Sequence, residues 1–142
     1  MNRTAEIGLL IARIVLGLTF AIHGYDKFQG GIGNVGMWFD SMGIPQFMSY
    51  IVAIVELVGG LLLIVGLGTR AIGALLAITM VVAIFKVKLA VGFTGNGEMA
   101  GYELDLALLA MSVMLVLTGS RLLSVDQLLF KSDASSKSSI SS

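Results

Sequence analysis

The stretch Arg13-Ile-Val-Leu-Gly-Leu-Thr-Phe-Ala-Ile-His-Gly-Tyr-Asp-Lys-Phe28 places an arginine, the chain's single histidine and a lysine inside one continuous apolar run. Five residues in it recur at spacings of four, three, four and three, which puts them on one side of a helix. They are Arg13, Gly17, Phe20, Gly24 and Lys27, with His23 beside them. The other faces carry Ile, Val, Leu and Ala, so the polar residues form a narrow seam that is expected to face other protein.

The composition of the whole chain predicts a membrane protein with one domain. The 142 residues are 56% hydrophobic and only 13% charged, with a mean hydropathy of +0.95. That charged fraction is about half the roughly 25% of soluble domains, so a lipid bilayer is the expected partner. The formal net charge is zero, which argues against a nucleic-acid partner, because binding phosphates needs a basic surface.

The absence of cysteine narrows the chemistry. With 0 Cys the chain cannot form disulfides, thiolate catalysts, Cys-ligated iron–sulfur clusters or a covalent c-type haem site. A single histidine cannot supply two axial His ligands within one chain, which argues against haem. The candidate ligands lack the His-x-x-x-His and Glu-x-x-His spacings, so no metal is predicted. These candidates are His23, Glu56, Glu103 and Asp105.

Four apolar stretches predict an all-α fold, an integral membrane four-helix bundle within residues 1–130. About 20 apolar residues cross a hydrocarbon core of ~30 Å. The first stretch contains an arginine and no small-residue cleavage site, so it is interpreted as an uncleaved span and not a signal peptide. A polar, serine-rich tail at 131–142 is expected to be disordered. The spans are expected at about 7–28, 47–66, 71–89 and 102–123.

Two glycine-rich connections, 29–45 and 90–101, join these spans. The first carries the only tryptophan, Trp38, in a segment expected to form a short interfacial helix, where the ring either anchors the protein or belongs to a substrate lid. With four spans, both termini lie on the same side of the membrane. That side has more basic residues than the other side, which predicts that both termini are cytoplasmic in a bacterial cytoplasmic membrane. The two sets are Arg3, Arg70, Arg121, Lys131 and Lys137 against Lys27, Lys86 and Lys88.

The ionisable residues within the predicted spans fall into two groups. Arg13 and Glu56 lie deep in the hydrocarbon region, where an unpaired charge is costly, so they are expected to form an ion pair. Such a pair either fixes helix register alone or belongs to a functional cavity. Of the two lysines that end the third span, one is expected to face the bundle and the other the interface. The outer group comprises His23, Lys27, Lys86, Lys88, Glu103 and Asp105.

This outer group suggests acid–base chemistry on a bound carbonyl or phenol. His23, Glu56 and Glu103 are the candidate catalytic residues, because such groups can transfer protons near neutral pH. The candidate substrate-binding residues are Lys27, Lys88 and Asp105. For His23 the alternative is an interfacial histidine without a catalytic role.

Three motifs in this order resemble the DoxX family of small bacterial membrane proteins over residues 5–130. The first is Arg13-x-x-x-Gly17-x-x-Phe20-x-x-His23-Gly24-x-x-Lys27-Phe28, and the second is Glu56-x-x-Gly59-Gly60-x-x-Leu63-x-x-Gly66-x-x-Thr69-Arg70. The third runs from Glu103 through Gly119-Ser-Arg-x-x-Ser-x-Asp126. The resemblance implies a four-helix membrane oxidoreductase, in some members linked to quinol oxidation, thiosulfate metabolism or resistance to catechols and quinones.

Together these features suggest a membrane redox protein that binds a quinone or a catechol-like aromatic in the outer half of the bundle. The cofactor is left open. Because the chain shows no redox centre of its own, electrons are expected to come directly from a bound partner or another subunit. The expected protein partner is a redox partner subunit or a second copy of the chain in a homo-oligomer. The alternatives are a non-catalytic subunit or scaffold of a redox complex and a carrier for toxic phenols.

Overall fold

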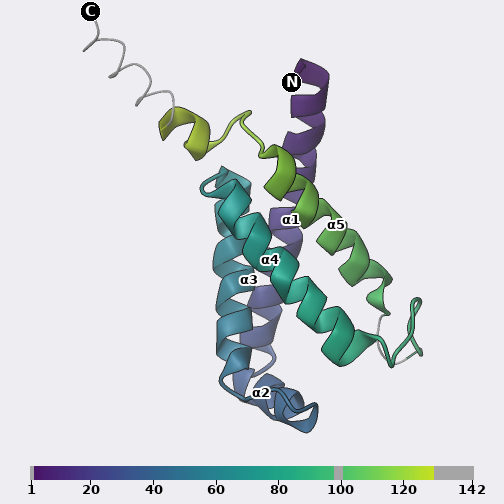
Figure 1. Cartoon of the computed structure of the whole chain (residues 1–142). Coiled ribbons are helices and arrows are strands. Elements are labelled where there is room, and N and C mark those ends of the chain that lie inside the picture. Colours follow the sequence, from purple (N-terminus) through teal and green to yellow (C-terminus); the bar gives the residue numbers. More distant parts are fainter. Residues whose placement is uncertain (1, 98–100, 130–142) are drawn as a thin grey trace, which may run out of the picture.

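The computed structural model describes residues 2–97 and 101–129, and helices account for most of them (Figure 1). This confirms the predicted all-α fold; the predicted tail at 131–142 lies outside the described residues. The third long helix ends in a π-helical turn, η1. The elements are α1 (Arg3–Gln29), α2 (Ile32–Ser41), α3 (Met48–Val65), α4 (Thr69–Ala83), η1 (Ile84–Lys88) and α5 (Tyr102–Thr118).

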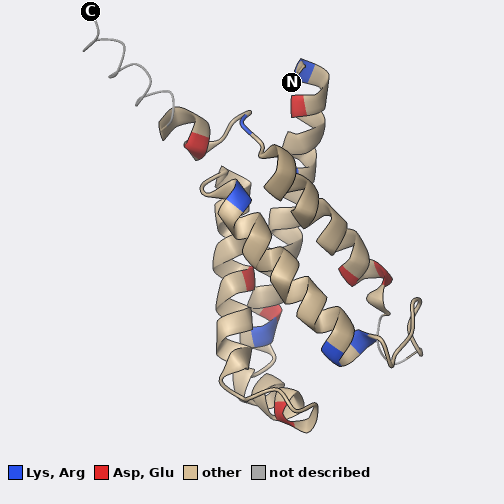
Figure 2. Cartoon of the chain, in the orientation of Figure 1, with Lys and Arg blue, Asp and Glu red and all other residues tan. Residues whose placement is uncertain are grey.

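The four long helices form two closely packed pairs. α1 packs mainly on α3, and α4 packs mainly on α5, while α3 and α4 join the pairs through a short turn. The start of α1, the α3–α4 turn and the end of α5 lie at one end of the bundle, and α2 lies at the other end (Figure 1). Most of the length of α4 and α5 carries no acidic or basic residue (Figure 2).

Within the described residues, three helices are long and apolar enough to cross a membrane. They are α1 with 27 residues, α3 with 18, and the continuous helix Thr69–Lys88 with 20. α5 has 17 residues and is one residue shorter than α3. Large apolar side chains cover the outside of the bundle, for example Ile11, Ile78 and Leu117, which are 59%, 62% and 73% exposed. An apolar outer surface of this extent suits lipid and not water.

Glycines bring the backbones of α1 and α3 into contact. A Cβ atom on Gly24 would lie 2.5 Å from the Leu57 nitrogen and 2.8 Å from the Ala53 oxygen, and one on Gly17 would lie 2.6 Å from the Gly60 oxygen. Only residues without a side chain allow this approach, as in other closely packed membrane helices. The contacts also set the antiparallel register, which decides the depth at which polar groups meet.

The last of the long helices, α5, ends five residues before the expected limit at 123. The chain leaves α5 at Gly119, which has a φ of +68° and so a conformation that favours glycine. The following apolar residues continue the hydropathy pattern and made the span look longer. After α5 the chain runs toward the start of α4. There the Asp126 carboxylate accepts hydrogen bonds from the Gly68 and Thr69 amides at 2.8 and 3.1 Å. It thereby caps the start of α4.

Candidate functional site

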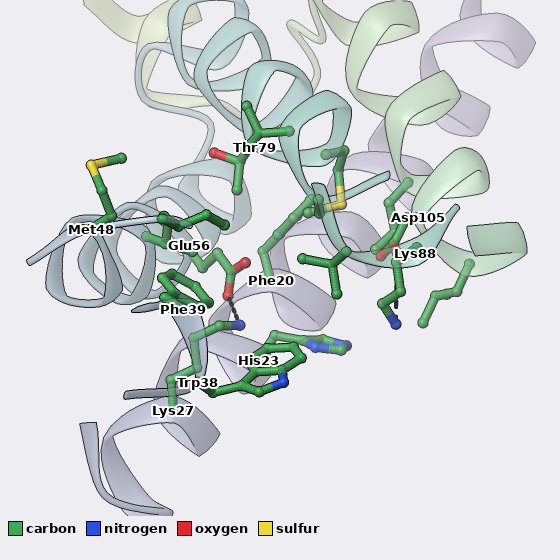
Figure 3. A pocket seen from close by; sticks show the side chains of 18 residues that line it. Phe20, His23, Lys27, Trp38, Phe39, Met48, Glu56, Thr79, Lys88 and Asp105 are labelled. Atoms are coloured by element: carbon green, nitrogen blue, oxygen red, sulfur yellow. Dashed lines mark hydrogen bonds and ion pairs between the residues drawn. The ribbon is translucent and has the colours of Figure 1, made fainter. Parts of the chain in front are cut away.

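A cavity of about 270 Å³ opens between the helices in the half of the bundle that lies toward α2 (Figure 3). Residues from α1, α2, α3, α4, η1 and α5 line it, and most of them are apolar. Three aromatic rings, from Phe20, Trp38 and Phe39, form part of the wall. Five ionisable side chains also line it, namely His23, Lys27, Glu56, Lys88 and Asp105.

The deepest charged residue of the cavity is Glu56, and its partner is Lys27. The Lys27 Nζ donates to Glu56 Oε2 at 2.7 Å, and the two side chains are 22% and 5% exposed (Figure 3). The predicted ion pair between Arg13 and Glu56 is therefore wrong. Glu56 does lie at the cavity, so the carboxylate proposed as catalytic is placed where a ligand could meet it.

Helix register and side-chain direction explain why Lys27, and not Arg13, reaches Glu56. With Gly17 against Gly60 and Gly24 against Ala53, Glu56 lies opposite the helical turns between these glycines. Arg13 is about two turns away from that level, roughly 12 Å along the axis. Side chains on a helix also lean toward its N-terminus, so Arg13 leans away from Glu56 and Lys27 leans toward it.

Arg13 instead binds backbone carbonyl groups at the opposite end of the bundle. It is 1% exposed, and its guanidinium donates to the carbonyls of Ser120, Leu122 and Leu123 at 3.1, 3.1 and 2.9 Å. These groups follow the end of α5, where the chain has left the helix. Arg13 therefore holds the segment after α5 and does not pair with α3.

A second ion pair lines the cavity on the side formed by η1 and α5. The Lys88 Nζ lies 3.9 Å from Asp105 Oδ2, and these side chains are 19% and 13% exposed (Figure 3). Lys86 is exposed and is not among the lining residues, which confirms that one lysine faces the bundle and the other faces outward. In η1 the Leu89 amide donates to the Ile84 carbonyl at 2.9 Å, a π-helical bond that the apolar pattern did not indicate.

The structure brings His23 to the cavity but not Glu103. His23 lines the cavity while remaining exposed. Glu103 is exposed and is not a lining residue, so its predicted place in the site is wrong. Side chains two positions apart on a helix point about 200° away from each other. Glu103 therefore points outward when Asp105 faces the cavity.

The sequence indicated the helix α2 and left open whether Trp38 anchors the protein or belongs to a substrate lid. The short helix expected around Trp38 is confirmed, and Trp38 and Phe39 pack with ring centroids 5.9 Å apart. Both residues line the cavity, although Trp38 also stays 41% exposed. A local pattern of aromatic residues cannot show which cavity they border, because that depends on how the connection folds back on the bundle.

The fold and this cavity define a small helical membrane protein with two ion pairs around an aromatic-walled pocket. The chain belongs to the DoxX family, whose model matches residues 8–89. It is 46% identical over 131 residues to "Putative oxidoreductase CatD" of Bacillus subtilis (strain 168), covering 92% of this chain and 93% of that protein. No solved structure matches it.

Two further relatives cover nearly the whole chain. "Inner membrane protein YqjF" of Escherichia coli (strain K12) is 31% identical, over 92% of this chain and 98% of its own length. An uncharacterized protein of Haemophilus influenzae (strain ATCC 51907 / DSM 11121 / KW20 / Rd) is 30% identical, over 87% and 91%. The family match includes Lys27, Glu56 and Lys88, whereas Asp105 lies beyond it.

Proposed function

We propose that this protein is an oxidoreductase of the bacterial cytoplasmic membrane that binds the ring of a quinone or a catechol-like aromatic in the cavity. The observation that carries the proposal is the pair of half-buried Lys27 and buried Glu56 in the wall of an otherwise largely apolar, aromatic-lined pocket. Charge inside a membrane bundle is costly, and where it lines a cavity it marks a functional site. The similarity to a protein named as an oxidoreductase supports this class of activity.

The size and lining of the cavity suit one substituted aromatic ring. An engineered cavity of about 150 Å³ holds benzene, so about 270 Å³ leaves room for a ring with substituents. Phe20, Trp38 and Phe39 supply apolar and aromatic surface against which such a ring can pack. Lys27 carries three N–H donors and uses one on Glu56 in the structure, so it can also donate to a ligand oxygen.

The charged residues suit the proton side of quinone chemistry. Reduction of a quinone to its quinol consumes two electrons and two protons, and oxidation of the quinol releases them. Glu56 and Asp105 provide carboxylates at the cavity, and His23 connects the cavity with its exposed edge. We assign the exchange of electrons to a partner subunit that bears a redox centre.

Trp38 gives a direct test of ligand binding, because it is the only tryptophan and lines the cavity. Titrating the detergent-solubilised protein with tetramethyl-1,4-benzoquinone is expected to quench its fluorescence with saturation. Lys88→Met should weaken this binding by about tenfold or more, since a hydrogen bond to a charged group contributes about 1.5–3 kcal/mol. Lys86→Met is the matched control, and it should bind like the wild type.

Partition of the quinone into the micelle, without binding to the protein, would give a different titration curve. Quenching that rises without saturation and is the same in all three proteins would show only partition of the quinone into the micelle. That result would contradict the proposal and favour the alternative of a scaffold subunit whose ion pairs hold the helices in register.

A further inference from the structure

The two ion pairs of the cavity differ in the distance between their charged groups. Lys27 and Glu56 share a hydrogen bond of 2.7 Å. Lys88 and Asp105 are 3.9 Å apart, beyond hydrogen-bond distance. Asp105 Oδ2 is buried and accepts no hydrogen bond within residues 2–97 and 101–129. On one side of the cavity the two charged groups therefore share a hydrogen bond, and on the other side one buried carboxylate oxygen, Asp105 Oδ2, lacks a donor among the described residues.

The separation of the second pair fits one bridging oxygen atom. Lys88 Nζ and Asp105 Oδ2 are 3.9 Å apart, so one oxygen atom can lie about 2.8 Å from both and form a hydrogen bond of ordinary length with each. Such an atom must accept from the ammonium group and donate to the carboxylate, because an ionised carboxylate can only accept. A hydroxyl group meets both requirements. A quinone carbonyl can only accept, so it leaves the carboxylate without a donor.

We propose that Lys88 and Asp105 form the subsite for a phenolic hydroxyl, so that the cavity prefers the reduced, hydroxyl-bearing ring to the corresponding quinone. This inference rests on the proposed function and specifies which redox state of the ligand the site recognises. A buried carboxylate that gains a donor is stabilised strongly, because few competing water molecules surround it. Asp105 is thus a specificity-determining residue in the first turn of α5.

The surroundings of the pair support this assignment. Lys88 is the last residue of η1, and Asp105 stands on α5, so the subsite belongs to the α4–α5 side of the bundle. The Lys27–Glu56 pair belongs to the α1–α3 side. Figure 3 shows the two pairs on different sides of the cavity with Phe20 between them. A ring with an oxygen at the second pair therefore has its apolar face available to the aromatic wall.

Isothermal titration calorimetry under anaerobic conditions tests the preference. The three probes share one tetramethylated ring and differ only in oxygen chemistry: tetramethyl-1,4-hydroquinone, its quinone and its dimethyl ether. We expect the wild type to bind the hydroquinone about tenfold more tightly than the other two, the effect of one hydrogen bond to a charged group. Asp105→Asn should abolish the preference, because a neutral amide can also donate to the quinone carbonyl.

Glu103→Gln is the control, since it changes an exposed carboxylate two residues away and should leave the preference intact. Equal binding of hydroquinone and quinone by the wild type, or a preference that survives in Asp105→Asn, would overturn the inference while leaving the proposed function standing. Failure of all three probes to bind would overturn both. The wild-type comparison decides the question even if Asp105→Asn does not fold.

Discussion

Replacing Lys27 by methionine is expected to lower the free energy of unfolding by about 3–5 kcal/mol, since it leaves a buried carboxylate without its partner. The Glu56 side chain is only 5% exposed and receives a hydrogen bond of 2.7 Å from Lys27. In an apolar bundle the carboxylate then has neither water nor a nearby ammonium group to stabilise its charge. Reversible unfolding in mixed micelles of a mild detergent and SDS measures the loss.

Two comparisons separate this effect from the loss of any lysine. Lys86→Met removes an exposed lysine from the same half of the molecule and should change stability by less than about 1 kcal/mol. The double variant Lys27→Met/Glu56→Gln should recover much of the loss, because no charge is left stranded. A double variant as unstable as the sum of its single changes would show that the two residues do not act as a pair.

Replacing Arg13 by methionine is expected to cost about 3 kcal/mol or more, because it removes donors from several carbonyl groups at once. Arg13 bonds the carbonyls of Ser120, Leu122 and Leu123, and these bonds hold the segment that carries Asp126. Without them the cap on α4 should loosen. Hydrogen exchange measured by mass spectrometry should therefore rise in the peptides covering 66–70 and 119–126.

Arg3→Met is the matched control, because Arg3 stands exposed on the same helix. Combining Arg13→Met with Glu56→Gln adds a test of the corrected pairing. The two residues lie at different levels and have different partners, so their effects should add to within about 0.5 kcal/mol. A coupling well above that value, or unchanged exchange at 119–126 in Arg13→Met, would contradict the structure.

The sequence predicted the helices well because their signals are local. Apolar runs interrupted by glycine and proline mark α1, α3 and α4 to within a few residues, and the polar seam of α1 correctly indicated a face packed against protein. The small residues of the seam, Gly17 and Gly24, are the ones that contact α3. The length of a helix and the residues that share one of its faces depend only on spacing along the chain, so both can be predicted from the sequence.

The sequence does not show the partners of Arg13, because they are backbone carbonyl groups and not an oppositely charged side chain. A guanidinium group has five donors, and the chain after a helix C-terminus offers carbonyl groups that need donors. Oppositely charged side chains are one solution to a buried arginine, and backbone carbonyls are another. Helical side chains lean toward the N-terminus of their helix, which directs Arg13 away from Glu56.

The cavity itself could be predicted only in part. Placing residues by depth brought His23, Lys27, Lys88 and Asp105 together, as the structure does. Depth alone cannot tell which side of a helix faces inward, so Glu103 was included wrongly. The parts contributed by Trp38 and by the π-helical turn depend on tertiary packing, and neither leaves a periodic signal in the sequence.

The proposed function requires a quinone-type ring to bind next to Trp38 within the bundle. Photolabelling in membranes with an azide-bearing short-chain quinone, followed by peptide mapping, tests it most directly. We expect label in α2 and in the first half of α3, near Phe39 and Met48, and we expect it to be lost when unlabelled quinone is in excess. Label spread over the outward-facing apolar residues and undiminished by the competitor would contradict it.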